Sequence, residues 1–326
     1  MPKKRVRSKT SKGRRTKLAL GVLGLLFGLL VISWSIRFAQ NFFGSKNYSW
    51  ERKFNINLLV RSSDISLFSY NPKDNKITII NVPDETFLQV PNGFGLWQLR
   101  SIYGLGGDKL LKETLTNFFA IPVDGFVDLS VLKPPQSAAQ LVDTLRKNPL
   151  SGVNLLTSVQ TDLTMWELLQ LKQGISSVRF DKIKTLDLLK FNVLDKENLA
   201  DGTPVFTTDQ IKLDSVLSDL RDPAIVSEHK SIAVFNATNH PQLAQKWARL
   251  ITNLGGNVII ISNAKSALQK TQVLGEQSST LKRLQQIFDL DCSNNPKCGK
   301  ISAMDEDIVA SRAQINLFLG EDYANR

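Results

Sequence analysis

The sequence predicts an α/β (α+β) protein that follows one N-terminal transmembrane helix. A single long uncharged apolar run lies near the N-terminus, short β-branched runs alternate with helical patterns after it, and a compact strand-helix-strand pattern begins at Ser231. Such alternation is typical of sheets with helices packed on them. We expect a basic tail at 1–17, a transmembrane anchor at 18–36, a connector at 37–53, a mixed sheet with helices at 54–221, a linker at 222–230 and a small α/β domain at 231–326.

The anchor is predicted from Leu18–Ile36, which contains nineteen residues and no charge. At about 1.5 Å per residue, a helix of this length spans roughly 28 Å, close to the thickness of a bilayer core. A cleaved signal peptide is the alternative, but its apolar core is usually shorter and ends at a small-residue site. Here the run continues into Trp34 without an A-x-A pattern. We therefore expect an uncleaved signal anchor.

Charge is concentrated before this anchor. The chain has 41 Lys/Arg and 30 Asp/Glu, a net charge of +11, and residues 1–17 hold nine of the basic residues and no acidic one. A basic flank is typical of the cytoplasmic side of a membrane helix. We therefore predict a single-pass plasma-membrane protein with a cytoplasmic N-terminus and extracytoplasmic domains. A transcriptional regulator that binds DNA through the tail is a third alternative, although no aromatic residue interrupts the tail and no specific nucleic-acid partner is expected.

Two cysteines, Cys292 and Cys298, lie in the sequence CSNNPKC near the C-terminus. Outside the membrane the redox environment permits a disulfide between them. The Asn-Asn-Pro sequence that separates them is typical of a turn. The sequence is compatible with either a disulfide between Cys292 and Cys298 or two free thiols.

The region from residue 54 begins with strand-like sequences. The Asn71–Asn75 cluster contains proline and turn-forming residues, so the strands on either side of it should form an antiparallel hairpin. A Pro/Gly-rich loop should follow, and the polar stretch 195–221 should also be a loop. We expect strands at 54–60, 64–71, 76–82 and 125–132, and helices at 96–103, 109–119, 137–146 and from Thr164 onward.

The C-terminal region has a clearer pattern. Leu243, Trp247 and Leu250 fall on one face of a helix, and Gly255-Gly256 ends it. The expected order is a strand at 231–238, a helix at 241–254, a strand at 257–264, a helix at 281–288 and a strand at 313–320.

Two groups of motifs resemble known bacterial envelope proteins. VRSSDISLFSYNPKDNKITIINVPDETFL, YGLGG and TLTNFFAIPVDGFVDLS resemble the first half of the LytR-CpsA-Psr domain. SIAVFNAT, NVIIISNA and AQINLFLGEDY resemble the LytR C-terminal domain. The resemblance covers about 54–190 and 231–323. It implies a membrane-anchored protein of cell-wall biogenesis, in a family whose members transfer lipid-linked glycopolymers onto peptidoglycan.

The resemblance also indicates where a site should lie. The family has an Arg-Ser-Asp-Thr pattern whose Asp helps to hold a metal; Asp64 matches it, and Arg61 matches with an offset of one residue. The family's Pro-Arg-Asp-Thr appears here as Pro83-Asp84-Glu85-Thr86, so an aspartate replaces the phosphate-binding arginine. The family's Lys-Ile-Asn falls on Gln98-Leu99-Arg100. Two of its expected cations are therefore absent.

The second half of the family's site is also missing. Only seventeen residues, 131–147, separate Ser130 from the segment that resembles the end of the domain, and they contain no Tyr-x-Arg-x-Arg motif. We therefore predict a reduced, noncatalytic LytR-CpsA-Psr-like domain with no catalytic residue assigned. Arg61, Asp64 and Arg100 are its candidate ligand-binding residues. Its expected partners are the membrane and a polyprenyl-linked glycopolymer, a polyprenyl carrier, peptidoglycan or an envelope protein.

The alternative is an enzyme. A Mg²⁺-dependent phosphotransferase that moves a lipid-linked glycopolymer onto peptidoglycan would use Asp64 and Glu85 as metal ligands, with Asp84 beside them. No cofactor is expected unless this alternative holds.

Overall fold

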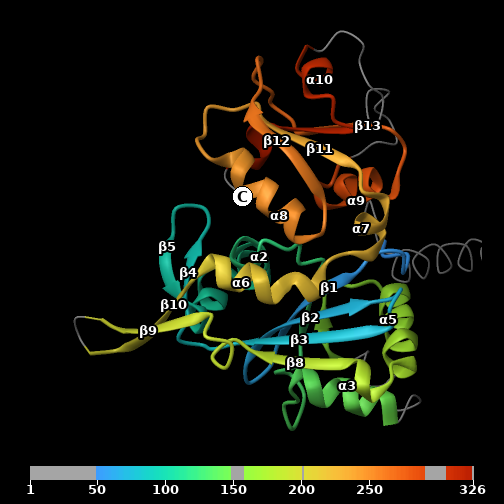
Figure 1. Ribbon diagram of the computed structural model, residues 1–326. Helices are drawn as coiled ribbons and strands as arrows, with labels where there is room; N and C mark the ends of the chain where they lie inside the picture. The colour runs from blue at the N-terminus through green and yellow to red at the C-terminus, as the bar shows by residue number, and fades with distance from the viewer. Residues whose placement is uncertain (1–48, 148–157, 200–201, 291–305, 325–326) are drawn as a thin grey trace, which may run out of the picture. The chain divides into compact units, whose positions relative to one another are not determined.

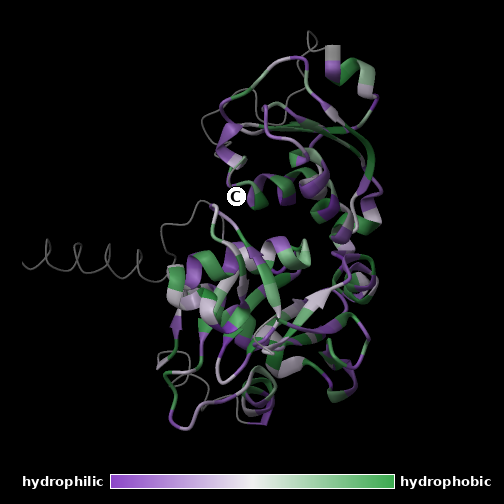
Figure 2. Ribbon diagram, turned by 90° about the vertical axis from the view of Figure 1, so that its left-hand side faces the viewer, coloured by the Kyte–Doolittle hydropathy of each residue, from purple (hydrophilic) through white to green (hydrophobic). Residues whose placement is uncertain are grey.

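The computed structural model describes residues 49–147, 158–199, 202–290 and 306–324 (Figure 1). The predicted tail, the anchor at 18–36, most of the connector, and both Cys292 and Cys298 lie outside the described residues. Within those residues, no helix is both long enough and apolar enough to cross a membrane. The predicted α/β class is confirmed: two main sheets are covered by helices, and hydrophobic segments occur in strands and along the helices (Figure 2).

The first sheet has six strands in the order β7-β6-β1-β2-β3-β8. The β2–β3 hairpin is confirmed, since Ile65 pairs with Val82 and Asn71 with Lys76. Strands β6 and β8 pair in parallel with β1 and β3, so the carboxyl ends of these four strands lie at one edge of the sheet. The strands are β1 (Ile56–Arg61), β2 (Ile65–Asn71), β3 (Lys76–Val82), β6 (Gly125–Asp128), β7 (Gln160–Thr161) and β8 (Ile183–Asp187).

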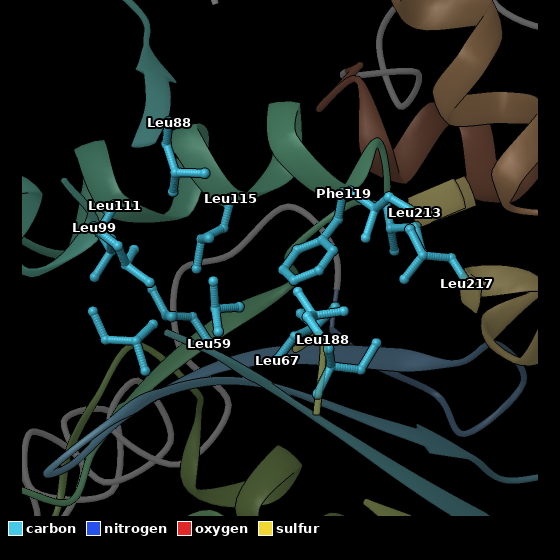
Figure 3. Packing of buried hydrophobic residues seen from close by; sticks show 14 of the residues in the cluster. Leu59, Leu67, Leu88, Leu99, Leu111, Leu115, Phe119, Leu188, Leu213 and Leu217 are labelled. Atoms are coloured by element: carbon cyan, nitrogen blue, oxygen red, sulfur yellow. The ribbon is translucent and has the colours of Figure 1, made fainter. Parts of the chain in front are cut away.

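Helices cover both faces of this sheet. Helix α2 (Leu99–Phe119) packs on one face, and α3 (Ala138–Lys147) and α5 (Met165–Ser177) lie on the other (Figure 1). Leu115 of α2 points toward Leu59 of β1 and Phe119 toward Leu188 (Figure 3), and all four side chains are 0% exposed. Side chains therefore fill the layer between α2 and the sheet.

Helix α2 corrects part of the helix prediction. The two predicted helices are one element with a kink at Gly106 and Gly107. Gly107 has φ 67° and ψ −157°, a conformation that essentially only glycine adopts, so the YGLGG sequence produces the kink. The predicted start at residue 96 is wrong, because residues 96–98 belong to a strand.

That strand is part of a hairpin formed by β4 (Phe87–Val90) and β5 (Gly95–Gln98), where we expected a loop. Leu88 and Val90 are each 1% exposed while Gln89 between them is exposed, so β4 has the alternation of a half-buried strand. Gly93 and Gly95 have φ of 80° and 79°, which lets the chain reverse direction. The nearby Pro and Gly residues favoured a loop in the sequence analysis, and the alternation of apolar and polar residues in β4 is only four residues long.

The loop predicted at 195–221 is wrong, because this stretch contains regular elements, and residues 223–228 of the predicted linker form a short helix. Leu213 and Leu217 are 0% exposed and pack in the main core, so this polar stretch is held by a few apolar residues. Asp209 and Asp222 accept hydrogen bonds from the first N–H groups of two short helices and cap them. The elements are β9 (Leu194–Asn198), β10 (Pro204–Thr208), α6 (Gln210–Val216), the 3₁₀ turn η2 (Leu217–Leu220) and α7 (Pro223–Glu228).

The C-terminal part has a four-stranded sheet in the order β12-β11-β14-β13. Strand β11 is parallel to β12 and β14, and β13, which the sequence did not predict, is antiparallel to β14. Trp247 and Ile251 of α8 pack on one face of the sheet, while Phe235 and Phe318 stack on the other with centroids 4.8 Å apart. The elements are β11 (Ser231–Asn236), α8 (Leu243–Asn253), β12 (Asn257–Asn263), β13 (Gln272–Gly275), α9 (Ser279–Ile287), α10 (Glu306–Ser311), β14 (Ile315–Leu319) and the turn η3 (Glu321–Tyr323).

Glu228 at the end of α7 holds the start of α9. Its carboxylate accepts hydrogen bonds from the Ser279 N–H at 2.7 Å, the Thr280 N–H at 2.8 Å and the Thr280 hydroxyl at 2.7 Å. Partial burial raises the pKa of Glu228, but the hydrogen bonds from Thr280 and Ser279 outweigh this and lower the pKa from 4.5 to about 2. The ionised form is therefore strongly preferred in the folded protein.

We expect Glu228→Gln to remove a pH-dependent contribution to stability. Because the folded pKa lies below the unfolded one, the carboxylate stabilises the fold fully above pH 4.5 and loses this effect as the pH falls toward 2. The variant should be less stable by about 1 kcal/mol at pH 7 and should match the wild type near pH 2. Urea unfolding at several pH values measures this. Glu276→Gln, which removes an exposed partner of Lys230, is the control; equal pH slopes for wild type and Glu228→Gln would contradict the assignment.

Candidate functional site

Charged and polar side chains gather where β1, β3 and β6 end and where β2 and α2 begin. The crevice outside the carboxyl ends of parallel strands is the usual ligand site of α/β sheets. We call this group the strand-end cluster; it consists of Arg61, Asp64, Asp84, Glu85, Arg100, Tyr103, Asp128 and Ser130.

Arg61, a predicted ligand residue, is partly buried and bound by neighbouring side chains. Its Nη1 lies 2.6 Å from Oδ2 of Asp128 and donates to the Ser130 hydroxyl at 3.1 Å. Its guanidinium carbon lies 4.0 Å from the centre of the Tyr103 ring, a cation–π contact. Asp128 is only 2% exposed, and its Oδ1 also accepts from the Ser130 N–H and hydroxyl. The positive charge of Arg61 is therefore already neutralised by a buried carboxylate.

Asp64 lies at the turn between β1 and β2. Its Oδ1 accepts hydrogen bonds from the Ser62 hydroxyl at 2.9 Å and the Ser63 hydroxyl at 3.1 Å. The side chain is half-buried, so one side of the carboxylate is fixed and the other reaches solvent. The structure thus positions Asp64 as an oriented hydrogen-bond acceptor.

Asp84 occupies the position where the resemblance places a phosphate-binding arginine. Burial raises the pKa of Asp84 above its usual value, and repulsion from Glu85 and Asp64 raises it further, while Arg100 lowers it. The Arg100 N–H donates to the Asp84 backbone carbonyl at 3.2 Å, and the Arg100 side chain is exposed. Asp64, Glu85 and Arg100 therefore share one electrostatic environment around Asp84.

The formal charge of the cluster is negative. Four carboxylates and two arginines give −2, where a site for a pyrophosphate needs positive charge. Among the described residues, no group of three or more His, Cys, Asp or Glu side chains is arranged to hold a metal ion. Mg²⁺ is usually held by one or two carboxylates together with substrate phosphates and water, so Asp64 and Glu85 would be its protein ligands in the enzyme alternative.

Three residues of the cluster were not predicted as site residues from the sequence: Tyr103, Asp128 and Ser130. Tyr103 begins the YGLGG run, and Asp128 and Ser130 lie in GFVDLS, so all three were in segments that carry the resemblance. Asp128 ends β6, and its position beside Arg61 follows from the parallel register of β1 and β6. The predicted strand at 125–132 runs past Asp128, where β6 ends, so no local signal marked this position, and its partner depends on the order of the strands.

The apolar layers beside the cluster contain little open space. The α2 side is filled by the packed core of Figure 3. On the other face, a cavity of about 40 Å³ lies between the sheet and helices α3 and α5, lined by side chains that include Leu58, Val142 and Leu171. Ligand pockets usually measure roughly 300–1,000 Å³, so a prenyl chain does not fit this cavity without separation of the layers.

Comparisons with known proteins agree with the resemblance. Residues 230–323 match the family described as LytR cell envelope-related transcriptional attenuator. The chain is 27% identical over 85 residues to the polyisoprenyl-teichoic acid--peptidoglycan teichoic acid transferase TagU of Bacillus subtilis, which is 26% of each chain. It is also 27% identical over 85 residues to TagU of Halalkalibacterium halodurans, which covers 26% of this chain and 27% of that protein. The matched part is thus about a quarter of these relatives' length.

Solved structures were also matched. TagV of B. subtilis is 17% identical, with a TM-score of 0.43 over 52% of this chain and 96% of that one. The LytR-CPS2A-psr family protein YwtF (TagT) with bound octaprenyl pyrophosphate lipid is 16% identical, with a TM-score of 0.38 over 54% of this chain and 92% of that one. The family match confirms the predicted LytR C-terminal domain at residues 230–323, and the similarity to TagU agrees with the LytR-CpsA-Psr resemblance of the sequence.

Proposed function

We propose that this protein is a membrane-anchored, extracytoplasmic component of bacterial cell-envelope assembly that binds a polyprenyl-linked glycopolymer without transferring it. The sequence relation to TagU, the LytR C-terminal domain and the predicted anchor at 18–36 support the envelope role. The N-terminus would lie in the cytoplasm, and residues 49–326 would lie outside the plasma membrane.

The negative charge of the strand-end cluster is the observation that supports binding without catalysis. Attack on a pyrophosphate develops negative charge, and the loss of one preorganised donor costs on the order of 3 kcal/mol in such reactions. Here Arg61 is bound to Asp128, and Asp84 stands at the family's arginine position. A transition state with added negative charge would be repelled rather than stabilised.

The same cluster is suited to sugar hydroxyl groups. Carboxylates accept hydrogen bonds from hydroxyls, and arginine and serine side chains donate to them. Asp64 is oriented by Ser62 and Ser63, and Arg100 is exposed at the start of α2. These residues supply acceptors and a donor for a polyhydroxylated chain.

The test uses the full-length chain in lipid vesicles with a polyprenyl-diphosphate-linked glycopolymer and peptidoglycan. We expect saturable binding with no release of polyprenyl phosphate. Asp64→Ala and Arg100→Ala should each weaken binding about tenfold, the effect of one charge-assisted hydrogen bond. Arg179→Ala, which removes an exposed arginine near the opposite edge of the sheet, should leave binding unchanged.

Two results would contradict the proposal. Mg²⁺-dependent release of polyprenyl phosphate that Asp64→Ala abolishes would make the protein a phosphotransferase. If the protein neither binds the glycopolymer nor releases polyprenyl phosphate, the proposed glycopolymer-binding function is wrong.

A further inference from the structure

The β4–β5 hairpin lies beside helix α2 (Figure 1). Large apolar side chains in its turn and second strand are exposed. Phe94 is 44% exposed, Leu96 64% and Trp97 40%. No charged residue occurs from Thr86 to Gln98. Clusters of exposed apolar side chains on a soluble surface are uncommon and mark interaction sites.

The hairpin is chemically suited to the interfacial layer of a bilayer. Tryptophan is enriched at this depth, where one part of its ring system contacts apolar chains and another stays near water. The Trp97 indole N–H donates to the Phe94 carbonyl at 2.8 Å, so this donor keeps its partner when water is removed. The absence of charge removes the largest cost of moving a segment out of water.

We propose that the tip of the β4–β5 hairpin inserts into the interfacial layer of the membrane. This inference rests on the proposed membrane anchoring of the chain. The inserted side chains are Phe94 in the turn and, on opposite faces of β5, Leu96 and Trp97. The insertion orients the sheet domain so that its strand-end cluster faces the bilayer.

The chain between the predicted anchor and the structure is long enough for this arrangement. Residues 37–48 separate the predicted anchor from Ser49. Twelve residues reach at most roughly 40 Å when extended. The chain enters the sheet at the start of β1, the edge opposite the hairpin, and the six residues of β1 span only about 20 Å. The connector therefore allows the hairpin edge to reach the membrane surface.

The arrangement would also place the strand-end cluster close to its ligand. Phe87 begins β4 just after Asp84 and Glu85, and Arg100 follows the end of β5. The Leu99 N–H donates to the Thr86 carbonyl at 2.9 Å and closes the base of the hairpin beside the cluster. A hairpin tip in the interface holds the cluster near the headgroup layer, where the glycopolymer of a lipid-linked substrate begins.

The experiment measures quenching of Trp97 by brominated lipids. The full chain is reconstituted in vesicles of phosphatidylcholine with bromine near the headgroup end of the acyl chain, and its fluorescence is compared with that of Trp97→Phe. The difference isolates Trp97 from the other four tryptophans of the chain. We expect the Trp97 component to be quenched and shifted to the blue, with no dependence on salt, because the hairpin carries no charge.

A double variant gives the matched control. Trp97→Phe combined with Phe180→Trp places an indole at a position that is 78% exposed, near the opposite edge of the sheet. Its fluorescence should show no quenching beyond that of Trp97→Phe alone. Leu96→Glu should abolish the quenching of Trp97 while leaving the circular dichroism spectrum unchanged, because Leu96 lies on the surface.

The outcomes separate the two proposals. If the chain does not float with vesicles, the membrane anchoring fails and the proposed function fails with it. If the chain floats but Trp97 is not quenched, the hairpin proposal is overturned while the anchoring stands. Quenching that survives Leu96→Glu would likewise overturn it, since insertion of a carboxylate is strongly unfavourable.

Discussion

Arg61→Ala is expected to destabilise the protein by about 2–4 kcal/mol. The substitution leaves the Asp128 carboxylate, which is 2% exposed, with hydrogen bonds from Ser130 but without its cation. A buried charge without its partner is the main cost of breaking such a pair. The Arg61 side chain is itself 29% exposed, so water offsets part of this cost. Chemical denaturation of the full chain measures the change.

Two further variants isolate this cause. In Arg61→Ala/Asp128→Asn the buried charge is gone, so most of the lost stability should return. Arg179→Ala breaks an exposed ion pair with Asp181, whose side chains are 79% and 58% exposed, and should cost less than about 0.5 kcal/mol. If the double variant is as unstable as Arg61→Ala alone, the loss comes from packing against Tyr103 rather than from charge.

Asp84→Arg is expected to tighten the binding of inorganic pyrophosphate by about 10- to 100-fold, the effect of one charge-assisted contact worth about 1.5–3 kcal/mol. The substitution restores the cation that the family resemblance places there and changes the formal charge of the strand-end cluster from −2 to 0. It also removes a carboxylate whose pKa is raised by burial and by Glu85 and Asp64. Titration calorimetry at fixed ionic strength measures the affinity.

Asp84→Asn is the matched control for this prediction. It removes the negative charge of Asp84 and adds no guanidinium, so it should improve binding by only a few-fold. The gain in Asp84→Arg should fall as salt is raised, because the cluster is partly exposed to solvent. Equal affinities for Asp84→Arg and Asp84→Asn would mean that repulsion, and not a missing donor, limits anion binding here.

Together these variants address why the site differs from that of a transferase. Arg61 is used for internal structure, and Asp84 opposes anions, so two separate changes remove positive charge from one edge of the sheet. The proposed binding role depends on the negative charge of this cluster, and the proposed membrane insertion depends on the uncharged hairpin beside it.

Local sequence pattern determined much of the fold. Strands β1 to β3 and the turn between β2 and β3 were predicted because apolar β-branched residues and a Pro/Asn cluster act over a few neighbouring residues. Helix α8 was predicted because its apolar face is wide and regular. The family resemblance was predicted from short motifs in a fixed order, and the domain at 230–323 is confirmed.

Only the tertiary structure decided the rest. The β4–β5 hairpin and the 195–221 region have too few apolar residues for a periodic signal, and their form depends on packing of Leu88, Val205 and Leu213 in the core. Arg61, Asp64 and Arg100 were predicted as site residues, but the buried partner of Arg61 was not. Asp128 lies 67 residues away in the sequence, and it reaches Arg61 because β1 and β6 pair in parallel in one register. Non-local pairing of this kind is set by the whole sheet, and no local pattern encodes it.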